Sequence, residues 1–120
     1  MTSTDPDGWQ THADQMLMTV ISQRRQITYN QLATAAGLTG SHRIHRLTVW
    51  LEQTMAEDHR CGRPIRAAVV ISKARGGLPA PGFFSVAEQL GLSFSEPDLI
   101  TGYHAYLDYL YKTLTPAGPM

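Results

Sequence analysis

The chain has 120 residues with ten lysines and arginines, ten acids and five histidines, so its formal net charge at pH 7 is zero. Its length predicts one domain with one hydrophobic core, and its apolar fraction of 42% is ordinary for a globular protein. No apolar run approaches the roughly 20 residues of a membrane helix. The one cysteine, Cys61, excludes an internal disulfide, and the start of the chain shows no signal-peptide pattern, so we expect a cytoplasmic protein.

The charges are distributed unevenly along the chain. Nine of the ten lysines and arginines lie between Arg24 and Arg75, where only three acids lie, so this stretch has a net charge of +6. The two flanks each have a net charge of −3. A basic centre is the electrostatic footprint of a protein that binds a polyanion. The alternative is that the acidic flanks fold back and neutralise the centre.

The first elements follow from hydrophobic spacing. Residues 1–8 are polar and rich in turn formers, so we expect a flexible N-terminus. Residues 9–23 predict a helix, because apolar side chains recur there at helical spacing. Arg24 and Arg25 end this helix, where positive charge is favourable, and they are equally suited to contact phosphate. Residues 26–28 are short and β-prone.

The next stretch is typical of a helix-turn-helix. Residues 29–36 predict a short helix, and Gly37 suits the left-handed residue that ends it. After a linker over 37–40, residues 41–57 predict a longer helix with Ser41 as its N-cap. In a helix-turn-helix, the second helix meets base edges in the major groove.

The polar face of that longer helix is the predicted recognition surface. Apolar side chains lie on one face of the helix, and the opposite face carries His42, Arg43, His45, Arg46 and Gln53. Cations in the first turns oppose the helix macrodipole by roughly 0.3–1 kcal/mol each, so their presence there indicates contacts with phosphates or bases. The alternative is a solvated face with incidental arginines.

A basic wing is expected after the recognition helix. Residues 65–72 predict a strand from the β-branched run 69–71. A turn-rich loop follows over 73–82, and residues 83–85 are expected to pair back against the strand. Lys73 and Arg75 would then lie at the tip of the wing. A plain surface hairpin is the alternative.

The C-terminal part predicts two helices. One covers 83–90 and ends at Gly91, and the other starts at Ser95 or Asp98. The last helix carries a broad aromatic and aliphatic face formed by Tyr103, Tyr106, Leu107, Leu110, Tyr111 and Leu114. Such a face usually packs in a core, and if exposed it would form a homodimer interface. Residues 115–120 are expected to be a flexible tail, which leaves 9–114 as the domain.

No motif predicts catalysis, a metal or a cofactor. His42 and His45 lack a third metal ligand at a matching spacing. Cys61 lies among basic residues, but no residue is evident that would orient it as a nucleophile. Glu57 and Asp58 are expected to form a solvated helix end. The chain is therefore expected to be non-enzymatic, without cofactor.

The order of these segments resembles the DNA-binding domain of O6-alkylguanine alkyltransferases and alkyltransferase-like proteins, over roughly residues 12–78. Residues 28–30, Thr-Tyr-Asn, match the Thr-Tyr-Gly that opens the first helix of that family's helix-turn-helix. Arg43 or Arg46 would match the arginine that replaces a flipped base. The family's strand reads Pro-Cys-His-Arg-Val-Val or Pro-Trp-His-Arg-Val-Val; residues 65–70 here read Ile-Arg-Ala-Ala-Val-Val. Arg66 therefore stands in the place of the alkyl acceptor. The resemblance implies a winged-helix architecture without methyl transfer.

Residues 69–84 also resemble part of a group of bacterial and phage-borne proteins.

The sequence thus predicts a mainly α protein with a small β-hairpin (α+β), a winged helix-turn-helix with an additional C-terminal helix. We expect it to bind double-stranded DNA as a transcriptional or phage-type regulator. The expected DNA-binding residues are Ser41, His42, Arg43, His45, Arg46, Gln53, Lys73, Arg75, Arg24 and Arg25. Two alternatives stay open: a protein–protein adaptor or inhibitor on the same fold, and an alkyltransferase-like lesion binder that lacks the acceptor cysteine.

Overall fold

The structure is a computed structural model that describes residues 8–94 and 98–115. Within these ranges the chain forms α1 (Trp9–Ser22), β1 (Ile27–Thr28), α2 (Tyr29–Ala35), α3 (Arg43–Arg60), the 3-10 helix η1 (Arg66–Val69), β2 (Val70–Ile71), the 3-10 helix η2 (Lys73–Arg75), α4 (Pro81–Gln89) and α5 (Leu99–Leu114). The fold is mainly helical with a small sheet, so the predicted α+β class is confirmed. None of the described helices is both long and apolar enough to cross a membrane.

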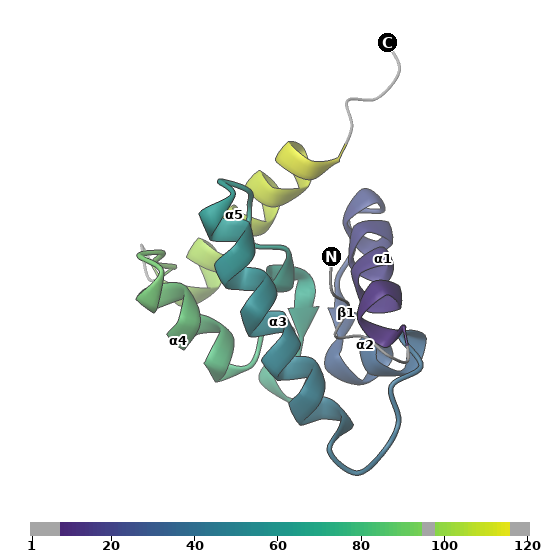
Figure 1. Cartoon of the computed structure of the whole chain (residues 1–120). Coiled ribbons are helices and arrows are strands. Elements are labelled where there is room, and N and C mark those ends of the chain that lie inside the picture. Colours follow the sequence, from purple (N-terminus) through teal and green to yellow (C-terminus); the bar gives the residue numbers. More distant parts are fainter. Residues whose placement is uncertain (1–7, 95–97, 116–120) are drawn as a thin grey trace.

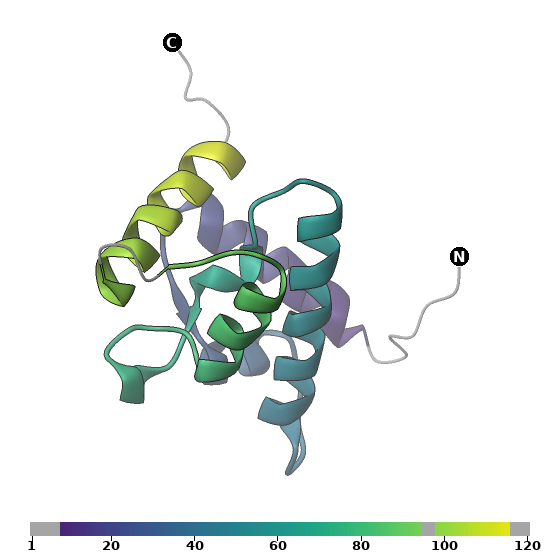
Figure 2. The same cartoon turned by 90° about the vertical axis from the view of Figure 1, so that its left-hand side faces the viewer.

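The helices pack around the segment that runs from η1 into β2. Figure 1 shows α3 in front and α1 to its right, and both contact η1. α5 also contacts η1, and α4 packs beside α3, as the turned view in Figure 2 shows. All four residues of η1 are buried, so this short segment forms the centre of the core.

The predicted strand over 65–72 is wrong over most of its length. Residues 66–69 form η1, and only the two residues of β2 pair with β1, in parallel, with Ile27 opposite Val70 and Thr28 opposite Ile71. A continuous apolar run indicates that a segment is buried on all sides. A buried 3-10 turn is as compatible with such a run as a buried strand is. The sequence therefore located the core segment without giving its conformation.

The return of the predicted wing lies earlier in the chain than expected. Ser72 and Leu78 form an isolated antiparallel bridge, with the Ser72 amide donating to the Leu78 carbonyl over 2.8 Å, and this bridge closes the loop 73–77. Residues 83–85 do not pair back, because they lie in α4, which Pro81 begins. The hairpin is thus reduced to a bridged loop, and the winged-helix architecture stays a prediction.

The helix-turn-helix region differs from the prediction in its connection. Thr28 and Gln31 form a capping box at the start of α2, with two hydrogen bonds of 3.0 Å, and Gly37 takes the predicted left-handed conformation at φ 78°. α3 begins at Arg43 with His42 as N-cap, so Ser41 as N-cap is wrong. The Arg43 amide donates to the Gly40 carbonyl in the preceding turn, and the helix starts one residue later than expected.

The aromatic face of α5 packs inside the chain. Tyr103, Leu107 and Leu110 are buried, and the N-cap of α5 is Asp98, one of the two residues expected to start this helix. Tyr103 donates to the Ala68 carbonyl over 2.6 Å. The other two tyrosines of this face also bind backbone distant in sequence, since Tyr106 accepts from the Ile65 amide and Tyr111 donates to the Arg25 carbonyl. The residues expected for a homodimer interface are therefore largely used in the core.

The predictions for the two ends of the chain fall almost wholly outside the described residues, as does Ser95. Only Gly8 and Thr115 of the predicted flexible ends are described, as the caps of α1 and α5.

Candidate nucleic-acid interface

The outward face of α3 is the surface that the sequence predicted. The helix is held on the core by its buried side, to which Leu47, Leu51 and Met55 contribute. Trp50 is buried as well, edge-on against Trp9 at 5.8 Å between ring centroids. The side chains opposite the core are exposed: His42, His45, Arg46, Val49 and Gln53. We call these five residues the α3 face.

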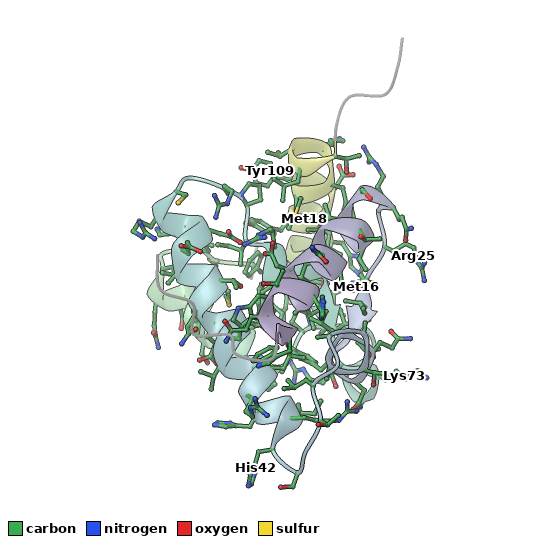
Figure 3. All side chains as sticks on the ribbon, turned by 45° about the vertical axis from the view of Figure 1, so that its right-hand side comes forward. Met16, Met18, Arg25, His42, Lys73 and Tyr109 are labelled. Carbon is green, nitrogen blue, oxygen red and sulfur yellow. The ribbon has the colours of Figure 1, made fainter. Side chains whose placement is uncertain are left out.

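The start of α3 projects from the body of the protein. Figure 3 shows His42 at the free end of the helix, with its side chain directed away from the other elements. One turn later, the Arg46 guanidinium lies 5.8 Å from the centroid of the Trp9 ring, while the residue stays exposed. This cation–π contact places the charge at the surface and leaves its hydrogen-bond donors available.

Arg43 has a different role from Arg46. Its guanidinium donates to Asn30 Oδ1 over 3.0 Å and to Thr34 Oγ1 over 3.3 Å, so it links α3 to α2. The side chain is only half-exposed. Arg43 therefore orients α3, and Ser41 is exposed in the linker before it.

A groove runs beside the α3 face. It has a volume of about 610 Å³ and lies between α2, α3 and the segment that follows β2. Ile44 and Thr48 form its α3 side, and Lys73 lies on the opposite side. Among the described residues that line it, Lys73 carries the only charge, so the groove has no carboxylate to repel a polyanion.

The bridged loop presents one of its two predicted cations. Lys73 is exposed, and Figure 3 shows its side chain at the edge of the molecule. Arg75 is half-exposed and turns back, because its Nε donates to the Pro79 carbonyl over 2.9 Å. The expectation that both side chains form the tip is thus wrong for Arg75, which instead holds the loop closed.

Arg24 and Arg25 lie apart from the α3 face. Both are exposed at the end of α1, next to α5, and they line a separate pocket with His104. In Figure 3, Arg25 lies far along the molecule from His42. The structure therefore does not bring these two arginines together with the α3 face.

The ion pairs sort the cations into two groups. Within residues 8–94 and 98–115, acids pair with four cations: Arg60, Arg63, Arg66 and Lys112. The six cations that the sequence assigned to DNA form no ion pair with a described acid. They are Arg24, Arg25, Arg43, Arg46, Lys73 and Arg75. Of the flanking acids, Asp14 pairs with Arg66 and Asp108 with Lys112, so neither neutralises these six.

A buried charge network was missed by the sequence analysis. Asp58, expected at a solvated helix end, is 0% exposed and binds both Arg63 and Arg66. Arg66 also pairs with Asp14 on α1. Burial lowers the pKa of Arg66, but hydrogen bonds and charges from the two aspartates outweigh burial and raise it overall. The available signal was spacing, because Asp58 follows Met55 by three residues on the apolar face of α3.

Arg66 therefore lies away from the groove, although it stands where the resemblance places the alkyl acceptor. A smaller recess behind the groove is lined by Tyr29 and Ala67.

Comparison of the chain with models of protein families, with curated proteins and with solved structures gave no match.

Proposed function

We propose that this protein is a non-enzymatic duplex DNA-binding protein, of the transcriptional or phage-regulator type, that contacts DNA with the α3 face and with Lys73. The observation that carries the proposal is the division of the cations. The described acids pair with cations outside the predicted surface, and none of them pairs with a cation that was predicted to bind DNA.

The dimensions and chemistry of the α3 face suit a major groove. His42 and Gln53 are eleven residues apart, which corresponds to about 16 Å along a helix and to about five base pairs. The major groove is about 12 Å wide and admits an α-helix. Arginine pairs with guanine or phosphate, and glutamine pairs with adenine. Val49, 41% exposed amid the polar residues of this face, is suited to a thymine methyl group.

The proposal assigns different work to the predicted residues. Arg46, His42, His45 and Gln53 contact DNA directly, and Lys73 contacts a phosphate across the groove. Arg43 acts by fixing α3 on α2. The residues that contact DNA are thus different from the residue that positions α3, and each can be tested by its own substitution.

The test is fluorescence anisotropy of a labelled random-sequence duplex over a range of salt concentrations. Wild type should bind at low salt and lose affinity linearly on logarithmic axes, with a slope of about −0.9 per phosphate contact. Arg46→Ala should flatten this slope by about 0.9 if the side chain meets a phosphate. It should cost about 1–3 kcal/mol of binding free energy if the side chain reads a base.

Arg60→Ala is the matched control. Arg60 is an exposed arginine on the same helix, but it lies outside the α3 face and pairs with Glu57 at 3.3 Å. Circular dichroism of each variant at the assay temperature shows whether it is folded. The proposal is wrong if wild type shows no affinity at low salt, which is the result expected of a protein–protein adaptor. If Arg46→Ala and Arg60→Ala bind the duplex equally well, the α3 face is not the surface that contacts DNA.

A second candidate, a binder of alkylated duplex DNA, is favoured by the groove beside α3. Its volume of about 610 Å³ is within the range of small-ligand sites, and Tyr29 and Asn30 line it next to the proposed DNA surface. An extruded base is held in such a site by stacking and edge hydrogen bonds. A duplex that contains one alkylated guanine should then bind more tightly than the unmodified duplex of the same sequence. Equal affinities would leave only the first proposal.

A further inference from the structure

A second charged pocket lies at the end of α1, away from the proposed DNA surface. It has a volume of about 310 Å³ and is formed by the turn after α1 and by one side of α5. Its polar lining consists of Arg24, Arg25, Gln26, His104, Asp108 and Tyr111. In Figure 3 its position is marked by Arg25, which lies far along the molecule from His42.

The pocket carries positive charge that the described part of the chain does not neutralise. The Arg25 guanidinium donates to the neutral side-chain amide of Gln23, over 3.3 Å, and neither Arg24 nor Arg25 forms an ion pair with a described acid. Asp108 is the acid in the lining, and it is bound by Lys112 at 2.9 Å. His104, which is exposed, lines the same pocket as the two arginines. The lining therefore carries two permanent cations, and its one acid among the described residues is already paired with Lys112.

The backbone of Arg24 adds an independent observation. Arg24 has φ 54° and ends α1 in a left-handed turn, with its amide bound to the Ile21 carbonyl and the Arg25 amide bound to the Val20 carbonyl. Glycine is the usual residue at this position of a helix end, because it has no Cβ to strain the backbone. Every other described residue with positive φ in this chain is a glycine. Strain of this kind persists mainly where the side chain has a function.

The polar base of the pocket is fixed by the fold. The Gln26 side-chain amide donates to the Tyr103 hydroxyl over 2.9 Å, and the Tyr111 hydroxyl donates to the Arg25 carbonyl over 2.7 Å. Both tyrosines belong to α5, so the strained turn is held against that helix. The positions of the two arginine backbones are thereby set before any ligand arrives, which lowers the entropic cost of binding.

We propose that this pocket binds the phosphate group of an anionic ligand. Two guanidinium groups present planar donor pairs that match phosphate oxygens. Two cations and an imidazole favour a dianion over a lone carboxylate. The phosphate belongs either to a small phosphorylated molecule, for which the pocket has room, or to the backbone of DNA. Only the second source depends on the proposed function.

The test is a titration of isotope-labelled protein with inorganic phosphate at constant ionic strength, followed by NMR and compared with chloride. The amide signals of residues 24–26 and the imidazole signals of His104 should shift and saturate. Loss of one charge-assisted contact should weaken the affinity about tenfold or more in Arg25→Ala and in Arg24→Gly. Arg24→Gly removes the backbone strain, so its melting temperature should equal or exceed that of wild type. Arg60→Ala should titrate as wild type does.

The source of the phosphate is found by adding an unlabelled duplex at low salt in place of phosphate. Shifts of the same signals assign the pocket to the DNA backbone, and unchanged signals assign it to a free phosphorylated ligand. The proposal would be overturned if the shifts caused by phosphate do not saturate. It would also be overturned if Arg25→Ala and Arg24→Gly both show the same shifts as wild type. The phosphate titration contains no DNA, so its failure is separate from a failure of the DNA-binding test.

Discussion

Replacement of Asp58 by alanine should destabilise the protein more than any change on its surface. The carboxylate is 0% exposed and accepts from Arg66 N and Nε at 3.1 Å each and from Arg63 Nη2 at 3.0 Å. These bonds join the end of α3 to η1, which is the centre of the core. Asp58→Ala removes all of these hydrogen bonds and ion pairs at once. The guanidinium of Arg66, a residue only 9% exposed, then keeps Asp14 as its remaining partner.

The size of the effect follows from what each arginine can do afterwards. Breaking a buried ion pair by removing one partner costs about 3–5 kcal/mol. Arg63 is half-exposed and can turn to water, and Arg66 keeps Asp14, so the lower value is appropriate. An unfolding entropy of about 2.1 cal/mol/K per residue converts a loss of about 3 kcal/mol into a fall in melting temperature of about 12 °C for a chain of this size.

The assay is thermal and urea unfolding, followed by the fluorescence of Trp9 and Trp50, whose rings meet in the core. The control is Glu57→Ala, which removes the preceding acid of the chain. Glu57 is 56% exposed and pairs with the exposed Arg60, so its loss should cost no more than about 0.5 kcal/mol. If Asp58→Ala proves no more destabilising than Glu57→Ala, the network does not hold α3 on the core, and the reasoning fails.

Two further predictions concern groups that hold the fold around the proposed surface. Burial raises the pKa of Tyr103 above its ordinary value of 10.0. A raised pKa in the folded state favours the neutral phenol, so its stabilisation is complete below about pH 10 and is lost as the pH rises further. Urea unfolding should therefore show stability falling above pH 10, with a shallower fall in Tyr103→Phe; equal pH slopes would contradict this. That variant should also cost about 1–3 kcal/mol at neutral pH, because it leaves the buried Ala68 carbonyl without its donor. Arg43→Ala should lower the melting temperature and weaken DNA binding without changing the salt slope, whereas Arg46→Ala should flatten the slope if its side chain meets a phosphate. A reduced slope in Arg43→Ala would show that Arg43 contacts phosphate itself.

The amphipathic helices were predictable because helical periodicity is a local property of the sequence. The apolar spacing of α1, α3 and α5 gave their positions and most of their buried residues, and Asp98, the N-cap of α5, was one of the two residues expected to start that helix. The α3 face followed from the same periodicity. Val49 belongs to it by angle alone, whatever the nature of its side chain.

The parts that failed depend on contacts between distant segments. The run 65–72 has no periodicity that separates a buried strand from a buried 3-10 turn, and only packing between α1 and α3 decides this. The partner of Arg66 on α1 lies 52 residues away, so no local pattern reports it. The same holds for Arg75, whose acceptor depends on how the loop closes.

The structural charges hold α3 at both of its ends. Its start is fixed to α2 by the hydrogen bonds of Arg43, and its end is fixed to η1 and α1 by Asp58 through Arg66. Between these two anchors, the exposed side chains form no ion pair with a described acid. Anchors that act through buried or half-buried groups leave the outward donors free and reduce the ordering that a bound duplex must impose. Arg43 and Arg66 therefore hold α3 in place, so the DNA contacts proposed for Arg46 would be made from a preformed surface.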